Sequence, residues 1–579
     1  MSQKNYLSTK PSLPPRFFPG LLILVVVILN LNTMRNGFTH DDREMLEPSR
    51  PALSRAWEVF LPDPAGSPYR PMQELSLIAN QTFGGSDPGG FRGLNVALHL
   101  LTTLLVFYLS AGILGERTAG FAAALLFAVH PVHVEAIQNL QNRGILLAAA
   151  AMFAALLLFV HNRGAGRGRS FGGAAAVAGL YAFALLSNEY ALVLPALWVL
   201  LALFFRPEES GKDRLGGLLR DLRFWSLLAV SAIYAAARNA AAVSVLGYSG
   251  IDFIRNPLAF ASAAERVLTA VDVIRRYLVL LVWPYGLSPD YSFDAVPLIA
   301  NLFSPQLLLS LATLAVPVVA ALWVGRKRPS YLFCCTFFLL SVAIVSNLFS
   351  PIRVTMAEGL LYVPSVAICW ALARFFLDLN WIPSDRMAAQ ASGLRRLKLI
   401  ALLLICIVVP WAGKTYVRNA EWKDDGTLYR AAIRTTPRSV RARLLLGDVY
   451  FAQSDYLGAE RHYYQALQIY PDFAEAAVRL AAAYRELDRF PKALELLNNF
   501  AGRSGTFEEQ RLRELGRVYF GLGEFRKAAD SYEQALRLND SDAEAHRELG
   551  IIYSQILNQP EKGRFHLERS RALASRSTL

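Results

Sequence analysis

The chain has 579 residues, 54% of them hydrophobic, and its mean hydropathy is +0.30. So apolar a composition excludes a soluble protein of this length and indicates an integral membrane protein. The formal net charge is +13, but the part from Arg418 onward has 25 basic and 23 acidic residues, so +11 belongs to the apolar part. That distribution favours basic loops on one side of a membrane over binding of nucleic acid.

Eleven apolar stretches are each long enough, or nearly so, to cross a hydrocarbon core that needs about 20 helical residues. They are residues 17–32, 91–114, 118–133, 143–161, 171–187, 188–205, 222–241, 306–325, 330–348, 360–378 and 398–415. If all eleven cross, the basic clusters 161–169, 206–220, 325–329 and 393–398 share one side with the N-terminus, and this side is predicted to be cytoplasmic.

One further apolar segment, residues 264–286, carries five charged residues. If it crossed the membrane, the basic cluster 325–329 would move to the wrong side. We therefore expect a re-entrant or interfacial helix there. The prediction is an all-α polytopic bundle of about eleven spans plus this helix.

Beyond Arg418 the sequence becomes periodic. Tyr450, Tyr484, Tyr519 and Tyr553 recur at steps of 34, 35 and 34 residues, with small residues in phase with them. This period is typical of tetratricopeptide repeats, in which two helices per unit stack into a solenoid. We predict a membrane domain over 1–417 and about four repeats over 418–579, outside the cytoplasm.

Polar side chains gather in the segments that this topology places on the outer face, and convergence of ionisable residues at one side of a membrane indicates a site. The candidate residues are Asp41, Asp42, Arg70, His130, His133, Glu135, Arg143, Glu189, Arg238, Asp290, Tyr291, Arg353 and Glu358. The three arginines 143, 238 and 353 could hold a phosphate, because a guanidinium pairs bidentately with phosphate oxygens.

Each group also has a structural interpretation. Asp41 and Asp42 could be solvated acids at a helix end, and the three arginines could reach from helix ends to the interface. His130, His133 and Glu135 lack the spacing and further ligands of a catalytic zinc site, so they could instead hydrogen-bond an interfacial turn.

The motifs "HDD" (40–42), "YRP" (69–71), "FAVHPVHVEAI" (127–137), "LSPDYS" (287–292) and "SNLFSPIRVTMAEGLLYVPS" (346–365), followed by repeats, occur in a characteristic order. In this order the chain resembles the transmembrane and tetratricopeptide-repeat O-mannosyltransferases and their bacterial relatives, which belong to the C-type membrane glycosyltransferases. The resemblance covers nearly the whole chain. It departs at Asn188, where a lysine is expected, and at Gly359, where an arginine is expected.

The resemblance implies transfer of a sugar, which is mannose in the named family, from a polyprenyl phosphate to an acceptor hydroxyl on the outer face. Asp41 and Asp42 match the acidic pair of the family's first outer loop, and the repeats would bind a protein or peptide acceptor. No nucleic-acid partner, no certain cofactor and no specific metal ligand is expected, although assistance by a divalent cation stays open. The implied location is a bacterial inner membrane with the repeats in the periplasm.

Two other function classes stay open. A catalytically inactive membrane scaffold would use its repeats to recruit proteins during envelope assembly. The changes at Asn188 and Gly359 favour it, whereas the retained "HDD" and "YRP" motifs disfavour it. A transporter or flippase is disfavoured, because the polar residues gather at one face instead of at the midplane.

Overall fold

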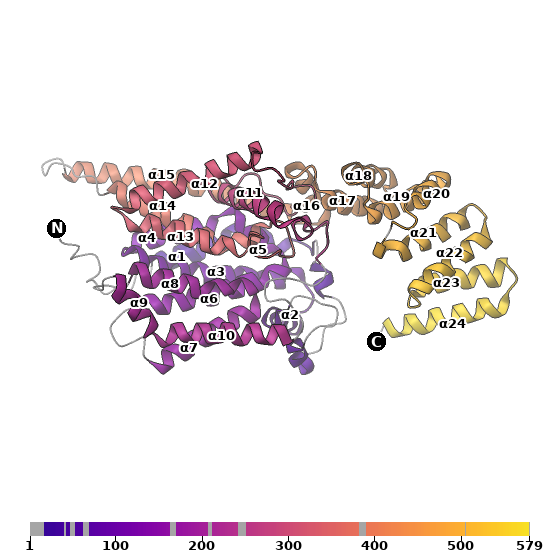
Figure 1. Cartoon of the computed structure of the whole chain (residues 1–579), viewed down its shortest axis with the longest axis horizontal. Coiled ribbons are helices and arrows are strands. Elements are labelled where there is room, and N and C mark those ends of the chain that lie inside the picture. Colours follow the sequence, from indigo (N-terminus) through magenta and orange to yellow (C-terminus); the bar gives the residue numbers. More distant parts are fainter. Residues whose placement is uncertain are drawn as a thin grey trace. The chain divides into compact units, whose positions relative to one another are not determined.

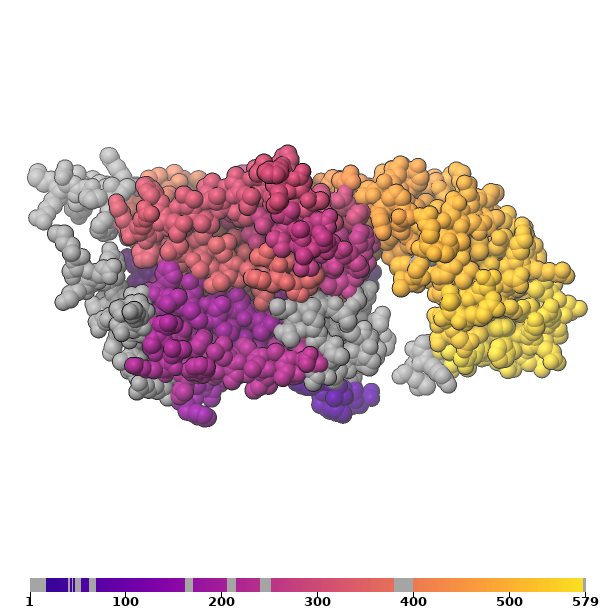
Figure 2. Space-filling model, in the orientation of Figure 1, coloured from indigo at the N-terminus to yellow at the C-terminus, as the bar shows by residue number. Residues whose placement is uncertain are grey.

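The computed structural model of the chain describes residues 17–39, 42–46, 53–61, 69–161, 170–205, 211–240, 251–380, 389–503 and 505–577. Two compact units comprise residues 1–431 and 432–579, and each is considered by itself. All regular elements in the described ranges are helices, which confirms the predicted all-α class (Figure 1). Figure 2 shows the same face as a space-filling view, with the remaining residues in grey.

The first unit is a bundle of long helices joined by short ones. The long helices are α1 (Phe17–Leu29), α2 (Pro71–Gly84), α3 (Pro88–Leu114), α4 (Arg117–Val129), α6 (Arg143–His161), α7 (Phe171–Ser187), α8 (Leu194–Phe205), α10 (Leu222–Ala240), α11 (Ala263–Val282), α12 (Pro305–Gly325), α13 (Pro329–Ala343), α14 (Ser365–Asn380) and α15 (Ala389–Glu421). The shorter elements that matter below are α5 (Val134–Gln138), α9 (Gly211–Leu219), η1 (Leu31–Arg35), η8 (Glu189–Val193) and η10 (Glu358–Leu361).

Local sequence explains where these helices begin and end. Helix α3 begins after Asp87, whose carboxylate accepts a hydrogen bond from the Gly90 amide, and Pro88 occupies its first turn. It ends at Gly115, whose φ of 77° is easily reached only without a side chain. Helix α11 begins with a capping box between Ser262 and Glu265.

All eleven predicted crossings correspond to helices, but their number as spans is not confirmed. Among the described residues five helices are long and apolar enough to cross a membrane, or six if the bent pair Arg117–Val129 and Pro131–Gln138 forms one broken span. The apolar helices Phe171–Ser187, Glu189–Phe205 and Pro329–Ala343 are shorter. Hydropathy identified the helices, whereas their breaks at Asn188 and near His130 reduce the uninterrupted apolar length.

The apolar helices at the surface of the bundle identify it as a membrane domain. In α12, Val316 is 69% exposed and Trp323 is 73% exposed, and only 17% of the most apolar window of this helix is buried. Exposing such a continuous apolar face to water would be unfavourable, whereas contact with lipid is not.

The second unit consists of four helix pairs, as the Tyr450–Tyr553 period predicts. The pairs are α17 (Val440–Ala452) with α18 (Tyr456–Ile469), α19 (Ala474–Glu486) with α20 (Phe490–Asn499), α21 (Glu508–Gly521) with α22 (Phe525–Leu538), and α23 (Ala543–Ile551) with α24 (Pro560–Ser577). Helix α16 (Asp425–Thr435) precedes them and contains the division between the units, which lies beyond the predicted boundary at 417/418.

Small residues in the repeats stand where paired helices approach closely. A Cβ atom added at Gly447 would lie 2.4 Å from the Tyr463 ring, and one added at Gly516 would lie 2.9 Å from the Tyr532 ring. Gly447 and Gly516 therefore leave room for the rings of Tyr463 and Tyr532, which pack closely against the preceding helix of each pair.

Candidate functional site

Asp42, from the predicted acid pair, is a buried and fully engaged carboxylate. Its Oδ2 lies 3.2 Å from Nη2 of Arg92 in α3, and the two side chains are 0% and 1% exposed. Its Oδ1 accepts a hydrogen bond of 2.9 Å from the Leu140 amide, and Oδ2 accepts one of 3.1 Å from the Thr39 amide. Asp42 therefore anchors the loop after η1 to α3 and to the turn before α6. Asp41 lies outside the described residues.

The Asp42–Arg92 pair belongs to a larger polar network. Arg92 also donates to the Gln138 carbonyl and side chain and to the Gly37 carbonyl. The Gln138 amide group in turn donates to Oδ1 of Asn419 at 3.1 Å. Residues far apart in the chain thus meet around one buried guanidinium, whose acceptors oppose the cost of its desolvation.

A second cluster surrounds Glu358, at the N-terminus of η10. Its carboxylate is 0% exposed, and it accepts hydrogen bonds from the Tyr291 hydroxyl at 2.9 Å and from the Ser288 amide at 2.5 Å. Nη2 of Arg418, at the end of α15, lies 3.3 and 3.2 Å from the two carboxylate oxygens. This cluster joins the 283–294 loop, η10 and the last membrane helix.

Burial is the largest influence on the pKa values of Glu358 and Tyr291 in this cluster. Burial raises the pKa of the Glu358 carboxyl, while the Arg418 guanidinium and the hydrogen bonds from Tyr291 and Ser288 oppose that rise. Burial and the neighbouring Glu358 charge also raise the pKa of the Tyr291 hydroxyl, so the tyrosine remains a hydrogen-bond donor to the carboxylate.

Glu135 supports this cluster from α5. Its Oε2 accepts hydrogen bonds from the amides of Glu358 at 2.7 Å and Gly359 at 3.0 Å. A carboxylate there satisfies amides at the start of η10 that have no partner within that turn. Glu135 therefore holds the backbone from which the Glu358 side chain projects.

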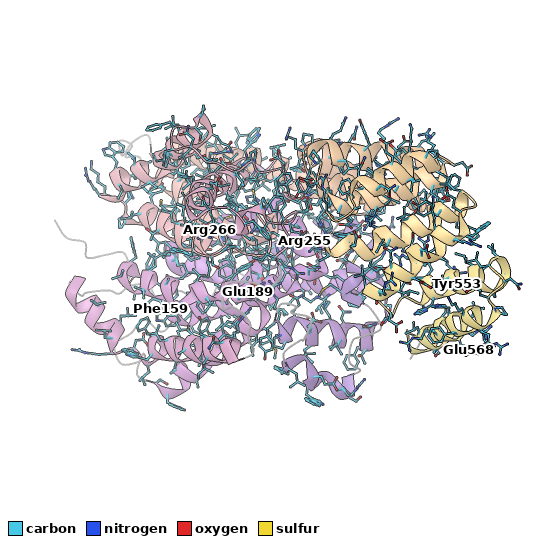
Figure 3. The ribbon with its side chains drawn as sticks, turned by 45° about the vertical axis from the view of Figure 1, so that its right-hand side comes forward. Phe159, Glu189, Arg255, Arg266, Tyr553 and Glu568 are labelled. Atoms are coloured by element: carbon cyan, nitrogen blue, oxygen red, sulfur yellow. The ribbon has the colours of Figure 1, made fainter. Side chains whose placement is uncertain are left out.

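A third cluster joins Arg70 and Glu189, which is labelled in Figure 3. Arg70 donates from Nε to Oε2 at 3.0 Å and from Nη2 to Oε1 at 2.8 Å, which is a bidentate pair at the start of α2. Arg238, near the end of α10, is 2% exposed and donates to the Tyr234 hydroxyl at 2.8 Å. Its Nε has no hydrogen-bond partner among the described residues, so this guanidinium retains donor capacity.

The other two predicted phosphate arginines have different environments. Arg143 is 0% exposed and donates to the Asn95 side chain at 2.8 Å and to the Phe91 and Ser76 carbonyls at 2.8 and 3.3 Å. These contacts give it a structural role between α2, α3 and α6. Arg353 is an exposed residue of the 344–364 loop.

The predicted histidines and Asp290 make local contacts. His130 uses both ring nitrogens, because Nε2 bonds the Leu281 carbonyl at 3.0 Å and Nδ1 accepts from the Val132 amide at 3.3 Å. His133 Nε2 lies 2.9 Å from the Ser365 hydroxyl. Asp290 accepts from the amide and hydroxyl of Ser292, which shapes its own loop. These contacts match the alternative of an interfacial turn.

The two departures from the family pattern also have structural settings. Asn188 caps η8 by accepting from the Tyr190 amide at 3.1 Å, and its Nδ2 is buried without a partner in the described structure. A Cβ atom added at Gly359 would lie 2.8 Å from Nδ2 of Asn142, so Asn142 occupies the space that a larger residue would need. Glu358 receives its guanidinium from Arg418 instead of from the neighbouring position.

Sequence reasoning did not include Arg92 and Arg418 in the site. Arg92 lies near the start of an apolar stretch, where an arginine reaching to the interface is the ordinary interpretation, and Arg418 lies where the apolar sequence gives way to the periodic one. Both face carboxylates more than 45 residues away in the chain. A signal was available, because each is a charged residue at the end of a long apolar helix.

Comparisons with known proteins support the resemblance seen in the motifs. Residues 252–318 match the family model "Protein O-mannosyl-transferase TMTC, DUF1736", and 413–472, 450–499 and 516–556 match models of tetratricopeptide repeats. A similar solved structure is "Crystal structure of MamA", with 20% identity, coverage of 26% of this chain and 88% of that one, and a TM-score of 0.24.

Several curated proteins align with most of the chain. "Protein O-mannosyl-transferase TMTC3" of Mus musculus is 24% identical over 82% of this chain and 53% of its own length. Tmtc1 of Drosophila melanogaster is 26% identical over 78% and 61%, and F38B6.6 of Caenorhabditis elegans is 24% identical over 79% and 63%. The chain thus spans less than two thirds of the length of these relatives, and it is similar in sequence to proteins named as TMTC protein O-mannosyl-transferases.

Proposed function

We propose that this chain is a membrane mannosyltransferase that moves a sugar from a polyprenyl-phosphate donor to a hydroxyl of a protein acceptor on the outer face. The observation that carries the proposal is the alignment of about four fifths of the chain with proteins named protein O-mannosyl-transferases. The clusters around Asp42, Glu358 and Glu189 supply buried ionisable groups in a mostly apolar bundle, where such groups are usually functional.

In the proposed reaction, Asp41 is the general base and Asp42 positions its loop. The acceptor hydroxyl oxygen attacks the anomeric carbon, its proton passes to the Asp41 carboxylate, and the bond from that carbon to the phosphate oxygen breaks. The phosphate leaves with the bonding electron pair. Asp42 is assigned the positioning role because its oxygens already accept from Arg92, Leu140 and Thr39.

Arg238 is the proposed donor-phosphate ligand. It is buried, it is held by Tyr234, and its Nε keeps an unused donor. A buried cation with incomplete hydrogen bonding is stabilised by an incoming anion. The Arg70–Glu189 pair lies within electrostatic range of it and would orient this side of the site.

The experiment that tests the proposal measures sugar transfer from polyprenyl-phosphate mannose by the reconstituted full chain. Asp41→Asn should reduce turnover by about 100-fold or more with little change in thermal stability, because a positioned base contributes at least that factor. Asp42→Asn should also reduce turnover, but with a clear loss of stability, because Arg92 then stays buried without its partner charge. Wild-type turnover in Asp41→Asn would contradict the assigned base.

Two controls complete the test. The same assay with EDTA, then with added magnesium or manganese, decides whether a divalent cation assists. Accessibility of cysteines introduced at exposed positions of the repeats, to a reagent that cannot cross membranes, decides the side on which they lie.

The alternative is an inactive scaffold that uses its repeats to bind proteins in envelope assembly. The observation in its favour is Gly359, which stands where the family pattern has an arginine and where Nδ2 of Asn142 lies 2.8 Å from the position of an added Cβ atom. A wild-type chain that neither transfers mannose nor hydrolyses the donor, but binds partners through residues 440–579, would favour this alternative.

A further inference from the structure

Two consecutive residues at the end of α15 contact the two carboxylate clusters of the bundle. Arg418 faces Glu358, and its neighbour Asn419 faces the network around Asp42. Both residues are 0% exposed. One helical turn therefore supports two loops that come from opposite halves of the first unit.

The Arg418 guanidinium lies between the carboxylates of Glu358 and Glu421 and binds both. Nη2 binds both oxygens of Glu358, and Nη1 donates to Glu421 in its own helix at 2.7 Å. Glu421 and the helix fix the orientation of the guanidinium. The guanidinium, which contacts both oxygens of Glu358, then fixes the plane of the Glu358 carboxylate. Glu358 then presents one oxygen to Tyr291 and Ser288, which orders the 283–294 loop.

Asn419 connects the end of α15 to the loop that precedes Asp42. Its carbonyl accepts from Nδ2 of Asn36 at 2.8 Å, and its Oδ1 accepts from Gln138 at 3.1 Å. Close by, the Lys423 carbonyl accepts a hydrogen bond of 2.9 Å from the Gly37 amide. The chain that leads into Asp41 and Asp42 is therefore attached to the end of α15.

We propose that Arg418 is a positioning residue, and that the last turn of α15 holds both the loop with Asp42 and the loop with Tyr291 in their working arrangement. This assignment rests on the proposed transferase function only for its effect on turnover. The hydrogen bonds predict a direct effect on loop order whether or not the chain transfers sugar.

The test combines hydrogen–deuterium exchange with transfer assays on the full chain. Arg418→Met should increase exchange in residues 283–294 and reduce turnover by about 100-fold, because displacing reacting groups by about 1 Å has effects of that size. Asn419→Leu should increase exchange around Asn30, because the Asn419 side chain donates to the Leu29 carbonyl and to Oδ1 of Asn30, whereas the backbone contact with Asn36 remains. The matched control is Arg374→Met, which removes an arginine from its ion pair with Asp378 in α14, and it should leave exchange in both segments unchanged.

The double variant Arg418→Met with Glu358→Gln separates positioning from simple stabilisation. It removes both buried charges, so thermal stability should recover relative to Arg418→Met alone. Turnover and protection of residues 283–294 should remain low, because the side-chain amide that replaces the carboxylate is no longer oriented from α15. Recovery of turnover together with stability would overturn the proposal, as would wild-type exchange in Arg418→Met. If the wild-type chain transfers no sugar, the proposed function fails while the exchange measurements still decide this assignment.

Discussion

Charged residues buried in pairs dominate the candidate site at the scale of single residues. Asp42 with Arg92 and Glu358 with Arg418 are each at most 1% exposed. Removing one partner of such a pair typically costs about 3–5 kcal/mol, because the other charge stays desolvated. Loss of activity in a single variant is therefore informative only beside a measurement of stability.

Lysine substitutions should distinguish a donor-binding role of Arg238 from a structural role of Arg143. Arg238→Lys should weaken binding of a polyprenyl phosphate by about tenfold or more, because the amine cannot replace a guanidinium that binds an oxyanion by two hydrogen bonds. Arg143→Lys should instead lower the unfolding temperature, since Arg143 binds Asn95 and two carbonyl groups. Donor binding by the folded Arg143 variant should stay close to wild type. Equal loss of donor affinity in both variants would contradict this division.

At the scale of elements, hydropathy and periodicity predicted the helices well. The stretches 143–161 and 171–187 coincide with α6 and α7, and the tyrosine period identifies four helix pairs. The partners of the buried charges could not be predicted, because apolar patterning shows which face of a helix is buried but not which helix covers it. For the same reason the sequence indicates Asp42 and the arginines as candidate residues but does not indicate their hydrogen-bond partners.

The close helix crossings in the repeats predict strong effects of small substitutions. Gly516→Ala should destabilise the repeats by about 1–3 kcal/mol through overpacking against Tyr532. Gly413→Ala, in α15, is the matched control, because nothing lies within 4 Å of the added methyl group. It should be neutral or stabilising by up to about 1 kcal/mol through helix propensity. Thermal unfolding of both variants provides the comparison.

A histidine pair predicts how the last repeat responds to pH. Nδ1 of His546 in α23 lies 2.9 Å from Nδ1 of His566 in α24, so one nitrogen must donate and the other accept. Burial and the neighbouring His546 lower the pKa of His566 below its usual 6.5. The contact therefore contributes fully above about pH 6.5 and is lost as pH falls below it.

The measurement is thermal unfolding of the repeats between pH 7.5 and pH 5 at constant salt. Stability should fall across this range in the wild type and less in His566→Gln, because glutamine does not titrate. The Asp540 carboxylate partly opposes the lowering of the His566 pKa and so limits the size of the effect. An identical pH dependence in both proteins would exclude this pair as its source.

For the whole molecule, the division into two units at 431/432 predicts that the repeats and the bundle have separable roles in activity. Deleting residues 440–579 should lower transfer to a protein acceptor far more than hydrolysis of the lipid donor. The reason is that the repeats, when present, raise the local concentration of the acceptor. The bundle keeps α15 and all three clusters in this variant. Equal loss of both activities in a truncated chain that still folds would show that the repeats stabilise the enzyme instead.

The contacts between residues 32–36 and the end of α15 also determine when the site can form during synthesis. Asn32 donates to the Tyr416 carbonyl and Asn36 to the Asn419 carbonyl, across 384 and 383 residues of chain. A growing chain folds from its N-terminal part first, so this segment is made early and remains without its support until the last membrane helix has been translated. Asp42 would therefore reach its final setting only in a nearly finished chain, and under the proposed function a ribosome-bound nascent protein would not modify hydroxyls prematurely.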